Sequence, residues 1–267
     1  MTRIEKRFAQ LKSEGRKAFI PYLTAGDPNL GATHELVLAL EKAGADVIEL
    51  GVPFSDPIAD GPVIQRATER SLRNGTTLHK VLELGENIRK KSDIALVLFS
   101  YFNPLLNHGL DKLAKDAAGA GFDGVLASDL TVEESRPFVE TMRDSGLNTI
   151  FLVAPTSSPD RVKKIVNAST GFLYAVSRTG VTGEQQELES DLKQFLRMLR
   201  GYTSLPIAVG FGISRPEHVR AVWQEAEGAI VGSSIVKAIE QNNARPDLAE
   251  RVAAFAAWLK GSESNEH

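Results

Sequence analysis

The stretch "ADVIELGVPFSDPIADGP", residues 45–62, holds the pattern on which the fold assignment depends. Residues 46–51 form a short apolar run of the kind that makes a buried strand, and a loop rich in proline and acidic residues follows it. After Gly61 the spacing of apolar residues changes to that of an amphipathic helix. A strand, a loop and a helix in this order indicate one unit of an α/β fold.

The same unit recurs along the whole chain. Apolar runs bounded by Gly, Pro, Asp or Ser predict strands at 18–24, 46–51, 95–101, 124–128, 149–154, 172–177, 206–212 and 228–234. Segments of helical spacing separate these runs, and a helix at 247–260 follows the last one. Eight strands, each followed by a helix, predict a (β/α)₈ TIM barrel. A doubly wound fold would want a glycine-rich turn after the first strand, where this chain has "TAGDPN" at 24–29.

No linker or shift in composition divides the chain. We therefore expect a single barrel domain over residues 1–260, with an extra helix at its amino-terminal end, and a disordered tail, "GSESNEH", at 261–267. The first fifteen residues are charged and amphipathic, which is not the pattern of a signal peptide.

The composition excludes several classes of protein. Of the 267 residues 42% are hydrophobic, the net charge is −3, and there is no cysteine. We therefore expect no nucleic-acid or membrane partner, no disulfide, no thiolate metal site and no cysteine nucleophile. No apolar run is long enough to span a bilayer, and a cytoplasmic protein is predicted.

In a barrel of this kind the active site lies in the loops that follow the strands. "VGFGIS" at 209–214 and "IVGSSIVK" at 230–237 each place glycine and serine where a strand passes into a helix. Free backbone N–H groups and the positive end of a helix bind phosphate well, so a phosphate-binding type of barrel is predicted. The loop "SRTGVTG", 177–183, adds two more glycines nearby. The alternative is that these glycines only permit tight turns.

Three acidic residues lie at or after the second strand. Glu49 has apolar neighbours on both sides, so desolvation should raise its pKa toward the range of a general acid or base. The alternative is a Glu paired with a buried Arg or Lys. Asp56 and Asp60 have a structural alternative as turn formers or helix caps, and for Asp56 we favour it.

Aromatic residues near other strand ends suit a flat apolar ligand, although such residues often belong to the upper barrel core. They are Tyr22, Phe99, Tyr101, Tyr174 and Phe211. The strand ends carry no lysine for a Schiff base, and the histidines form no pair at zinc-ligand spacing. What remains is proton transfer by carboxyl groups, without a metal, on a phosphorylated and partly aromatic substrate.

Taken together, "IPYLTAGDP", "ELGVPFSDPIADGPVIQRA", "GFDGVLASDL", "SRTGVTG", "VGFGIS" and "IVGSSIVKAIE" closely resemble the tryptophan synthase alpha subunit family. The resemblance covers roughly residues 5–240 in order and at family spacing. It implies a cytoplasmic, allosterically coupled lyase of tryptophan biosynthesis that performs a retro-aldol cleavage of indole-3-glycerol phosphate to indole and glyceraldehyde 3-phosphate.

The resemblance also implies a role for each matching residue. Glu49 would be the catalytic acid/base and Asp60 the acid that contacts the indole N–H. The indole pocket would comprise Tyr22, Phe99, Tyr101, Tyr174 and Phe211, and the phosphate would be bound by Gly183, Gly212, Gly232 and Ser233. The lid and partner loops would contain Pro53, Asp56 and Thr182.

As to partners, the resemblance implies a beta subunit in an alpha–beta–beta–alpha heterotetramer. No cofactor is expected in this chain, and pyridoxal phosphate is expected in the beta subunit. The chain departs from the family pattern at Thr131, where proline is usual, and at Ser234, where alanine is common.

Two other readings remain open. A sibling phosphate-binding barrel of the same pathway would want a catalytic Lys or Cys at a strand end, which this chain does not offer. A non-catalytic effector that only activates a beta subunit would carry nearly the same residues, and an assay with added beta subunit would distinguish it.

Overall fold

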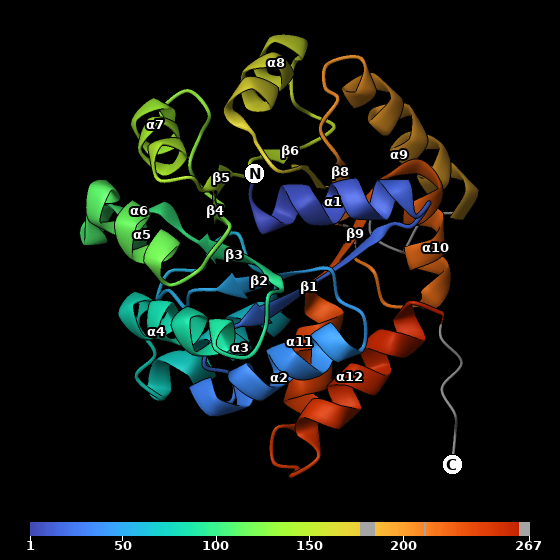
Figure 1. Ribbon diagram of the computed structural model, residues 1–267. Helices are drawn as coiled ribbons and strands as arrows, with labels where there is room; N and C mark the ends of the chain where they lie inside the picture. Colours follow the sequence, from blue (N-terminus) through green and yellow to red (C-terminus); the bar gives the residue numbers. More distant parts are fainter. Residues whose placement is uncertain (177–184, 211, 262–267) are drawn as a thin grey trace.

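The structure, a computed structural model, describes residues 1–176, 185–210 and 212–261, with the side chains of 185–190 left aside. Parallel strands form a ring, and helices surround it (Figure 1). Within the described residues the strands are β1 (Ala18–Thr24), β2 (Val47–Gly51), β3 (Ala95–Ser100), β4 (Gly124–Ala127), β5 (Asn148–Thr149), β6 (Leu152–Val153), β7 (Leu173–Val176), β8 (Ile207–Gly210) and β9 (Gly228–Val231).

The helices of the described residues lie outside the ring except for the first. They are α1 (Arg3–Ser13), α2 (Leu30–Lys42), α3 (Pro62–Arg73), α4 (Leu78–Arg89), α5 (Phe102–His108), α6 (Leu110–Gly119), α7 (Arg136–Asp144), α8 (Pro159–Ala168), α9 (Gln185–Arg200), α10 (Pro216–Glu225), α11 (Ser233–Asn242) and α12 (Leu248–Leu259). No helix in the described ranges is both long and apolar enough to cross a bilayer.

The predicted fifth strand is divided into β5 and β6, and together they close the ring. β5 pairs with β4, and β6 pairs with β7. Between the two pieces, the Ile150 N–H donates to the Val125 carbonyl over 3.1 Å, and the Phe151 carbonyl accepts from the Tyr174 N–H over 3.2 Å. Because these bonds continue both ladders, the predicted eight-position barrel is confirmed, with its fifth position made of two short strands.

A separate cluster of buried side chains fills the inside of the barrel. Val47, Val97, Leu126 and Ile230 pack there with the apolar face of α1. Figure 1 shows α1 lying across the ring of strands, which confirms the predicted extra helix. One end of the barrel is therefore closed by α1, and the opposite end, with the carboxyl ends of the strands, remains for a site.

Two arginines of α1 pair with carboxylates at the closed end. Arg7 donates to Asp46 over 2.6 and 2.9 Å, and Arg3 lies 3.3 Å from Asp123. Both carboxylates are buried, and each also accepts a backbone N–H from a strand. Pairing offsets the cost of burying these charges.

Near the last strand the predicted boundaries were wrong. The expected strand 228–234 ends at Val231, and Ser233 already begins α11, a helix that the sequence reading did not assign. The run "IVGSSIVKAI" is apolar enough for either structure, so length alone could not place the change. The consequence is that Gly232 and Ser233 lie at a helix amino terminus. Residues 262–267 of the predicted tail lie outside the described residues.

Candidate active site

Glu49 lies inside the barrel, two residues after Val47 on β2. It is completely buried, and in the register of the sheet it stands beside Tyr22 on β1 and Val97 on β3. Burial alone raises the pKa of its carboxyl group to about 8. The group is therefore protonated at neutral pH.

Neither carboxyl oxygen of Glu49 has a hydrogen-bond partner among the described residues. Asp46 and Asp123, at the other end of the barrel, are equally buried but paired with arginine. An unpaired buried carboxyl group destabilises a fold and calls for another explanation, which a bound substrate would provide. This result disfavours the alternative of a Glu held by a buried cation, as far as the described residues extend.

Asp60 lies on the loop between β2 and α3 and is half-buried. Burial raises its pKa to about 6, and the neighbouring Tyr101 hydroxyl acts in the opposite direction. The structural alternative of a cap is not borne out, because Gly61 is the N-cap of α3 and no described side chain caps this helix. Asp56 is exposed on the same loop and accepts a hydrogen bond from the Ser55 hydroxyl over 2.7 Å.

Tyr101 anchors the loop that carries Asp60. Its hydroxyl accepts the Ala59 N–H over 2.9 Å, and its ring lies 5.4 Å from the Phe54 ring, centroid to centroid. Burial, with the nearby Asp60 charge as the second cause, raises the pKa of Tyr101 to about 12. Tyr101 therefore stays neutral and holds the Asp60 loop against the end of β3.

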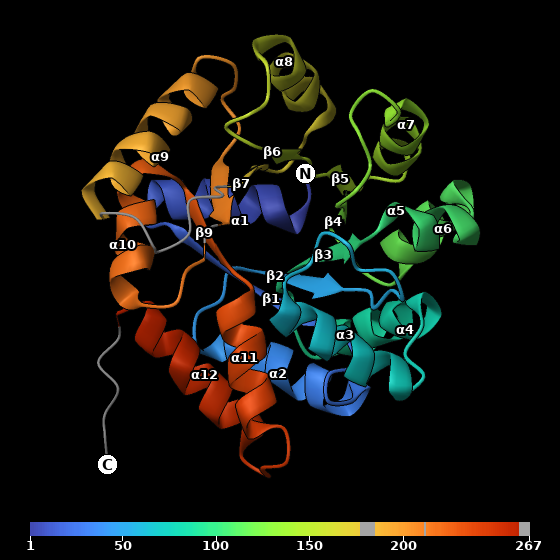
Figure 2. The ribbon, with the colours of Figure 1, turned by 180° about the vertical axis from the view of Figure 1, so that it is seen from behind.

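Two further tyrosines lie close to the acids of the site. Burial raises the pKa of Tyr22, and the negative charges of Asp60 and Glu49 raise it further. Burial and then Glu49 raise the pKa of Tyr174 in the same way. Because both acids act on Tyr22, Glu49 and Asp60 both lie near this residue of β1. Figure 2 shows the ring of strands from behind, with α1 on its far side.

The predicted aromatic wall is partly assembled. The Tyr22 and Phe99 rings meet edge to face with centroids 5.3 Å apart. Phe99, Tyr174 and Leu152 of β6 are partly buried and pack against the interior cluster. Sequence reasoning missed Leu152, because an unbroken apolar run does not reveal which residues face inward. Phe211 lies outside the described residues.

Glycines on two strands leave room for the tyrosine rings. A Cβ atom on Gly51 would lie 2.1 Å from the Tyr22 hydroxyl, and one on Gly210 would lie 2.5 Å from the Tyr174 ring. Leu50 and Val209, the residues before the two glycines, pack in the core between strands and helices, so Gly51 and Gly210 face the barrel interior. The width of the site thus depends on the absence of two side chains.

We expect Gly51→Ala to lower both stability and activity. The added methyl group must displace the Tyr22 ring, and overpacking of this kind costs on the order of 1–3 kcal/mol of unfolding free energy. Thermal unfolding and kcat/KM for the proposed substrate would measure the change. Gly119→Ala is the control, because a Cβ atom there would lie within 4 Å of no atom of the described residues. Equal behaviour of the two variants would contradict the packing argument.

The candidate phosphate site lies where β8 and β9 end. Gly212 follows β8, Gly232 is the N-cap of α11, and Ser233 is its first residue. The N–H groups of the first turn of a helix have no intrahelical partner, so they are available to an anion. Thr182 and Gly183, the other expected residues, lie outside the described residues.

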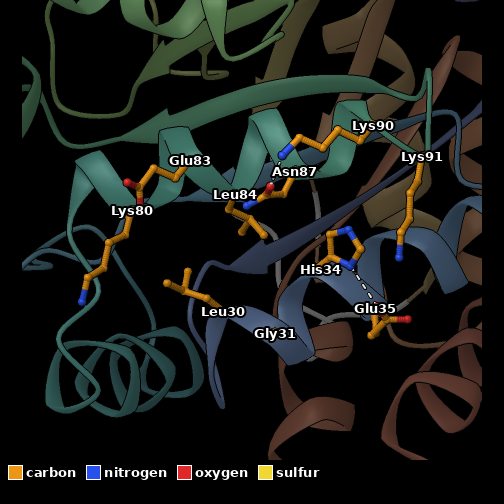
Figure 3. Close-up of a pocket in the computed structure, with 10 residues that line it drawn as sticks. All are labelled: Leu30, Gly31, His34, Glu35, Lys80, Glu83, Leu84, Asn87, Lys90 and Lys91. Atoms are coloured by element: carbon orange, nitrogen blue, oxygen red, sulfur yellow. Dashed lines mark hydrogen bonds and ion pairs between the residues drawn. The ribbon is translucent and has the colours of Figure 1, made fainter.

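Outside the barrel mouth, a groove of about 470 Å³ lies between α2 and α4 (Figure 3). Its polar side chains are mostly engaged: His34 contacts Glu35, Lys80 donates to the Gly75 carbonyl, and Lys90 donates to the Asn87 side chain. Among the described residues, no group of three or more His, Cys, Asp or Glu side chains could hold a metal ion.

Comparison with known proteins gives a consistent result. The family model described as tryptophan synthase alpha chain matches residues 8–263. The tryptophan synthase alpha chain of Solibacter usitatus is 53% identical over 260 residues, 97% of each chain. The crystal structure of tryptophan synthase subunit alpha from Legionella pneumophila superposes with a TM-score of 0.91 at 36% identity, covering 98% of both chains. A chain in the crystal structure of the tryptophan synthase complex from Pyrococcus furiosus superposes with a TM-score of 0.84 at 38% identity, covering 91% of this chain and 98% of that one.

Proposed function

Because the chain belongs to the tryptophan synthase alpha chain family, which cleaves indole-3-glycerol phosphate in tryptophan biosynthesis, we propose that Glu49 and Asp60 carry this cleavage. The chain is a lyase that releases indole and glyceraldehyde 3-phosphate. The observation that carries the assignment of residues is the buried carboxyl group of Glu49 inside the barrel, which has no hydrogen-bond partner in the part of the chain that the structure describes.

Glu49 acts first as an acid and then as a base. Breaking the bond requires a proton on indole C3 and the loss of one from the C3′ hydroxyl of the glycerol chain. A carboxyl group with a pKa of about 8 is protonated at neutral pH and can give its proton to C3. The carboxylate that results can then accept the hydroxyl proton, so a single residue serves both transfers.

Asp60 stabilises the positive charge that develops on the ring. Protonation at C3 turns the indole into a cationic indolenine, with the charge shared by its nitrogen. Asp60, with a pKa of about 6, is mostly ionised at neutral pH and supplies a negative charge at the N–H. The environments of the two acids thus separate their pKa values, which separates their roles.

The rest of the site positions the substrate. Tyr22, Phe99, Tyr101, Tyr174 and Phe211 line the indole pocket, and Leu152 joins them. Gly183, Gly212, Gly232 and Ser233 bind the phosphate, supported by the position of the last two at the start of α11. Thr182 engages the Asp60 loop when the lid closes.

The partner is a beta subunit. The likeness to a chain of a tryptophan synthase complex supports this. The assembly is an alpha–beta–beta–alpha heterotetramer, in which the loop around Pro53 and Asp56 faces the beta subunit and transmits the allosteric coupling. Ile58, on the same loop, is 86% exposed, which suits a surface that a partner covers.

No cofactor belongs to this chain, and pyridoxal phosphate belongs to the beta subunit. The protein is cytoplasmic, and residues 1–260 form one domain.

The test is an assay of indole release from indole-3-glycerol phosphate, with the full chain alone and with a tryptophan synthase beta chain added. We expect cleavage that the beta chain accelerates. Complex formation with no cleavage in either condition would favour the non-catalytic effector. Turnover of a different phosphorylated substrate of the pathway, with none of indole-3-glycerol phosphate, would favour a sibling barrel.

A further inference from the structure

Two separate loops make up the described part of the candidate phosphate site. One follows β8 and contains Gly212 and Ile213, and the other follows β9 and contains Gly232 and Ser233. For both loops to bind one phosphate group, their spacing must match the size of that group. Backbone N–H groups that are misplaced by even a fraction of an ångström lose hydrogen-bond energy.

The hydroxyl of Ser234 joins these two loops. Ser234 is the second residue of α11, and its hydroxyl donates to the carbonyl of Ile213. The Ile213 side chain is itself buried in the main hydrophobic core, so packing of this side chain and the hydrogen bond to its carbonyl both fix the residue. The hydrogen bond thus connects the residue after Gly212 to the residue after Ser233.

Among the described residues of the two loops, no other side chain forms a hydrogen bond from one loop to the other. The Ser214 N–H donates to the His218 ring over 3.3 Å, which is a contact between the β8 loop and its own helix, α10. The start of α11 is fixed on another side, since Val236 packs with Tyr22 over the end of β1. The Ser234 hydroxyl is therefore the described polar link across the gap between the loops.

We propose that Ser234 is a positioning residue that sets the spacing of the two phosphate-binding loops through its hydrogen bond to the Ile213 carbonyl. Its proton is committed to that carbonyl, so it does not act as a donor to the phosphate. The proposal rests on the proposed phosphate site at Gly212, Gly232 and Ser233. Its effect should fall on binding of the phosphate end and leave the chemistry at Glu49 unchanged.

The test is the substitution Ser234→Ala in the full chain, with glycerol 3-phosphate as the probe in isothermal titration calorimetry. One intramolecular hydrogen bond contributes about 0.5–1.5 kcal/mol, and we expect the dissociation constant to rise about three- to tenfold. KM for indole-3-glycerol phosphate should rise by a similar factor while kcat stays within about twofold. Ser234→Thr, which keeps the hydroxyl, should restore both constants.

Ser169→Ala is the matched control. The Ser169 hydroxyl also donates to an isoleucine carbonyl, that of Ile165, over 2.7 Å at the end of α8. Ser169 is buried, whereas Ser234 is partly buried. We expect this variant to bind glycerol 3-phosphate as the parent does. Alanine is favoured in helices, so folding of Ser234→Ala is expected, and thermal unfolding of all variants would verify it.

The outcomes separate the two proposals. Parent-like binding by Ser234→Ala, in a parent chain that binds glycerol 3-phosphate, would overturn the role of Ser234 and leave the phosphate site standing. An equal loss in Ser234→Ala and Ser169→Ala would also overturn it, since the effect would then be one of general stability. A parent chain that does not bind glycerol 3-phosphate would overturn the phosphate site itself.

Discussion

Glu49→Gln should abolish indole release from indole-3-glycerol phosphate and leave the fold intact. Glutamine has the size of the protonated acid, and the site of Glu49 contains no cation among the described residues that would be left unpaired. The amide cannot give a proton to C3 or accept one from the hydroxyl, so both transfers are lost. Acid–base transfer by a positioned group contributes about 10²–10⁴-fold, and with two transfers on one residue we expect a loss at or beyond the upper end.

The same substitution should change how stability depends on pH. The pKa of Glu49 is raised by burial from 4.5 to about 8 in the folded chain, so the folded state holds its proton more tightly than the unfolded state. The stability contributed by this group is therefore full below pH 4.5 and is lost as the pH rises toward 8. Glutamine does not titrate, and Glu49→Gln should lose less stability over this range than the parent.

Urea unfolding of parent and variant at pH 6 and pH 8.5 would measure this difference (two conditions chosen around the pKa). If the unfolding free energies of parent and variant changed equally between the two pH values, Glu49 would not have the raised pKa on which this prediction depends. Turnover by Glu49→Gln near the parent rate would independently remove it from the mechanism.

Asp60→Asn should have the second-largest effect on the reaction. The substitution keeps the shape of the side chain but removes the negative charge that faces the indole N–H. Loss of one group that stabilises charge in a transition state costs about 10²–10³-fold in kcat. KM should change much less, because the neutral ring of the bound substrate needs that charge less than the indolenine does.

The pH profile provides a further measure of the Asp60 role. In the parent, kcat/KM should fall below a pH of about 6 as Asp60 becomes protonated, and above about 8 as Glu49 loses its proton. In Asp60→Asn the acidic limb should disappear while the alkaline limb remains. The pKa of Tyr101 should also fall toward 10, since the Asp60 charge contributes to raising it.

Tyr101→Phe is a suitable comparison for Asp60→Asn. It removes the hydroxyl that accepts the Ala59 N–H and so loosens the Asp60 loop, but it leaves the carboxylate in place. We expect a smaller loss of kcat than in Asp60→Asn and a retained acidic limb. If the acidic limb of the kcat/KM profile persisted unchanged in Asp60→Asn, a group other than Asp60 would be responsible for that limb.

The barrel itself was predictable from local patterns. The alternation of apolar runs with helical segments depends only on neighbouring residues, so the strands at 18–24 and 95–101 were placed almost as the structure has them. The same local patterns could not locate the break at Ile150 and Phe151 or the start of α11 at Ser233. In both places an apolar run suits more than one structure, and pairing with distant strands decides between them.

The sequence by itself determined the class of fold, the strand that carries Glu49, and the loop that carries Asp60, because these follow from the order of residue types along the chain. Only the tertiary structure decided that Glu49 has no hydrogen-bond partner in the described ranges, while Asp46 and Asp123 are paired with arginines of α1. It also decided that Tyr22 lies beside Glu49, and that Ser234 reaches the Ile213 carbonyl. The physical reason is that burial and pairing depend on groups far apart in the chain, which meet only when the ring of strands closes and sets their register.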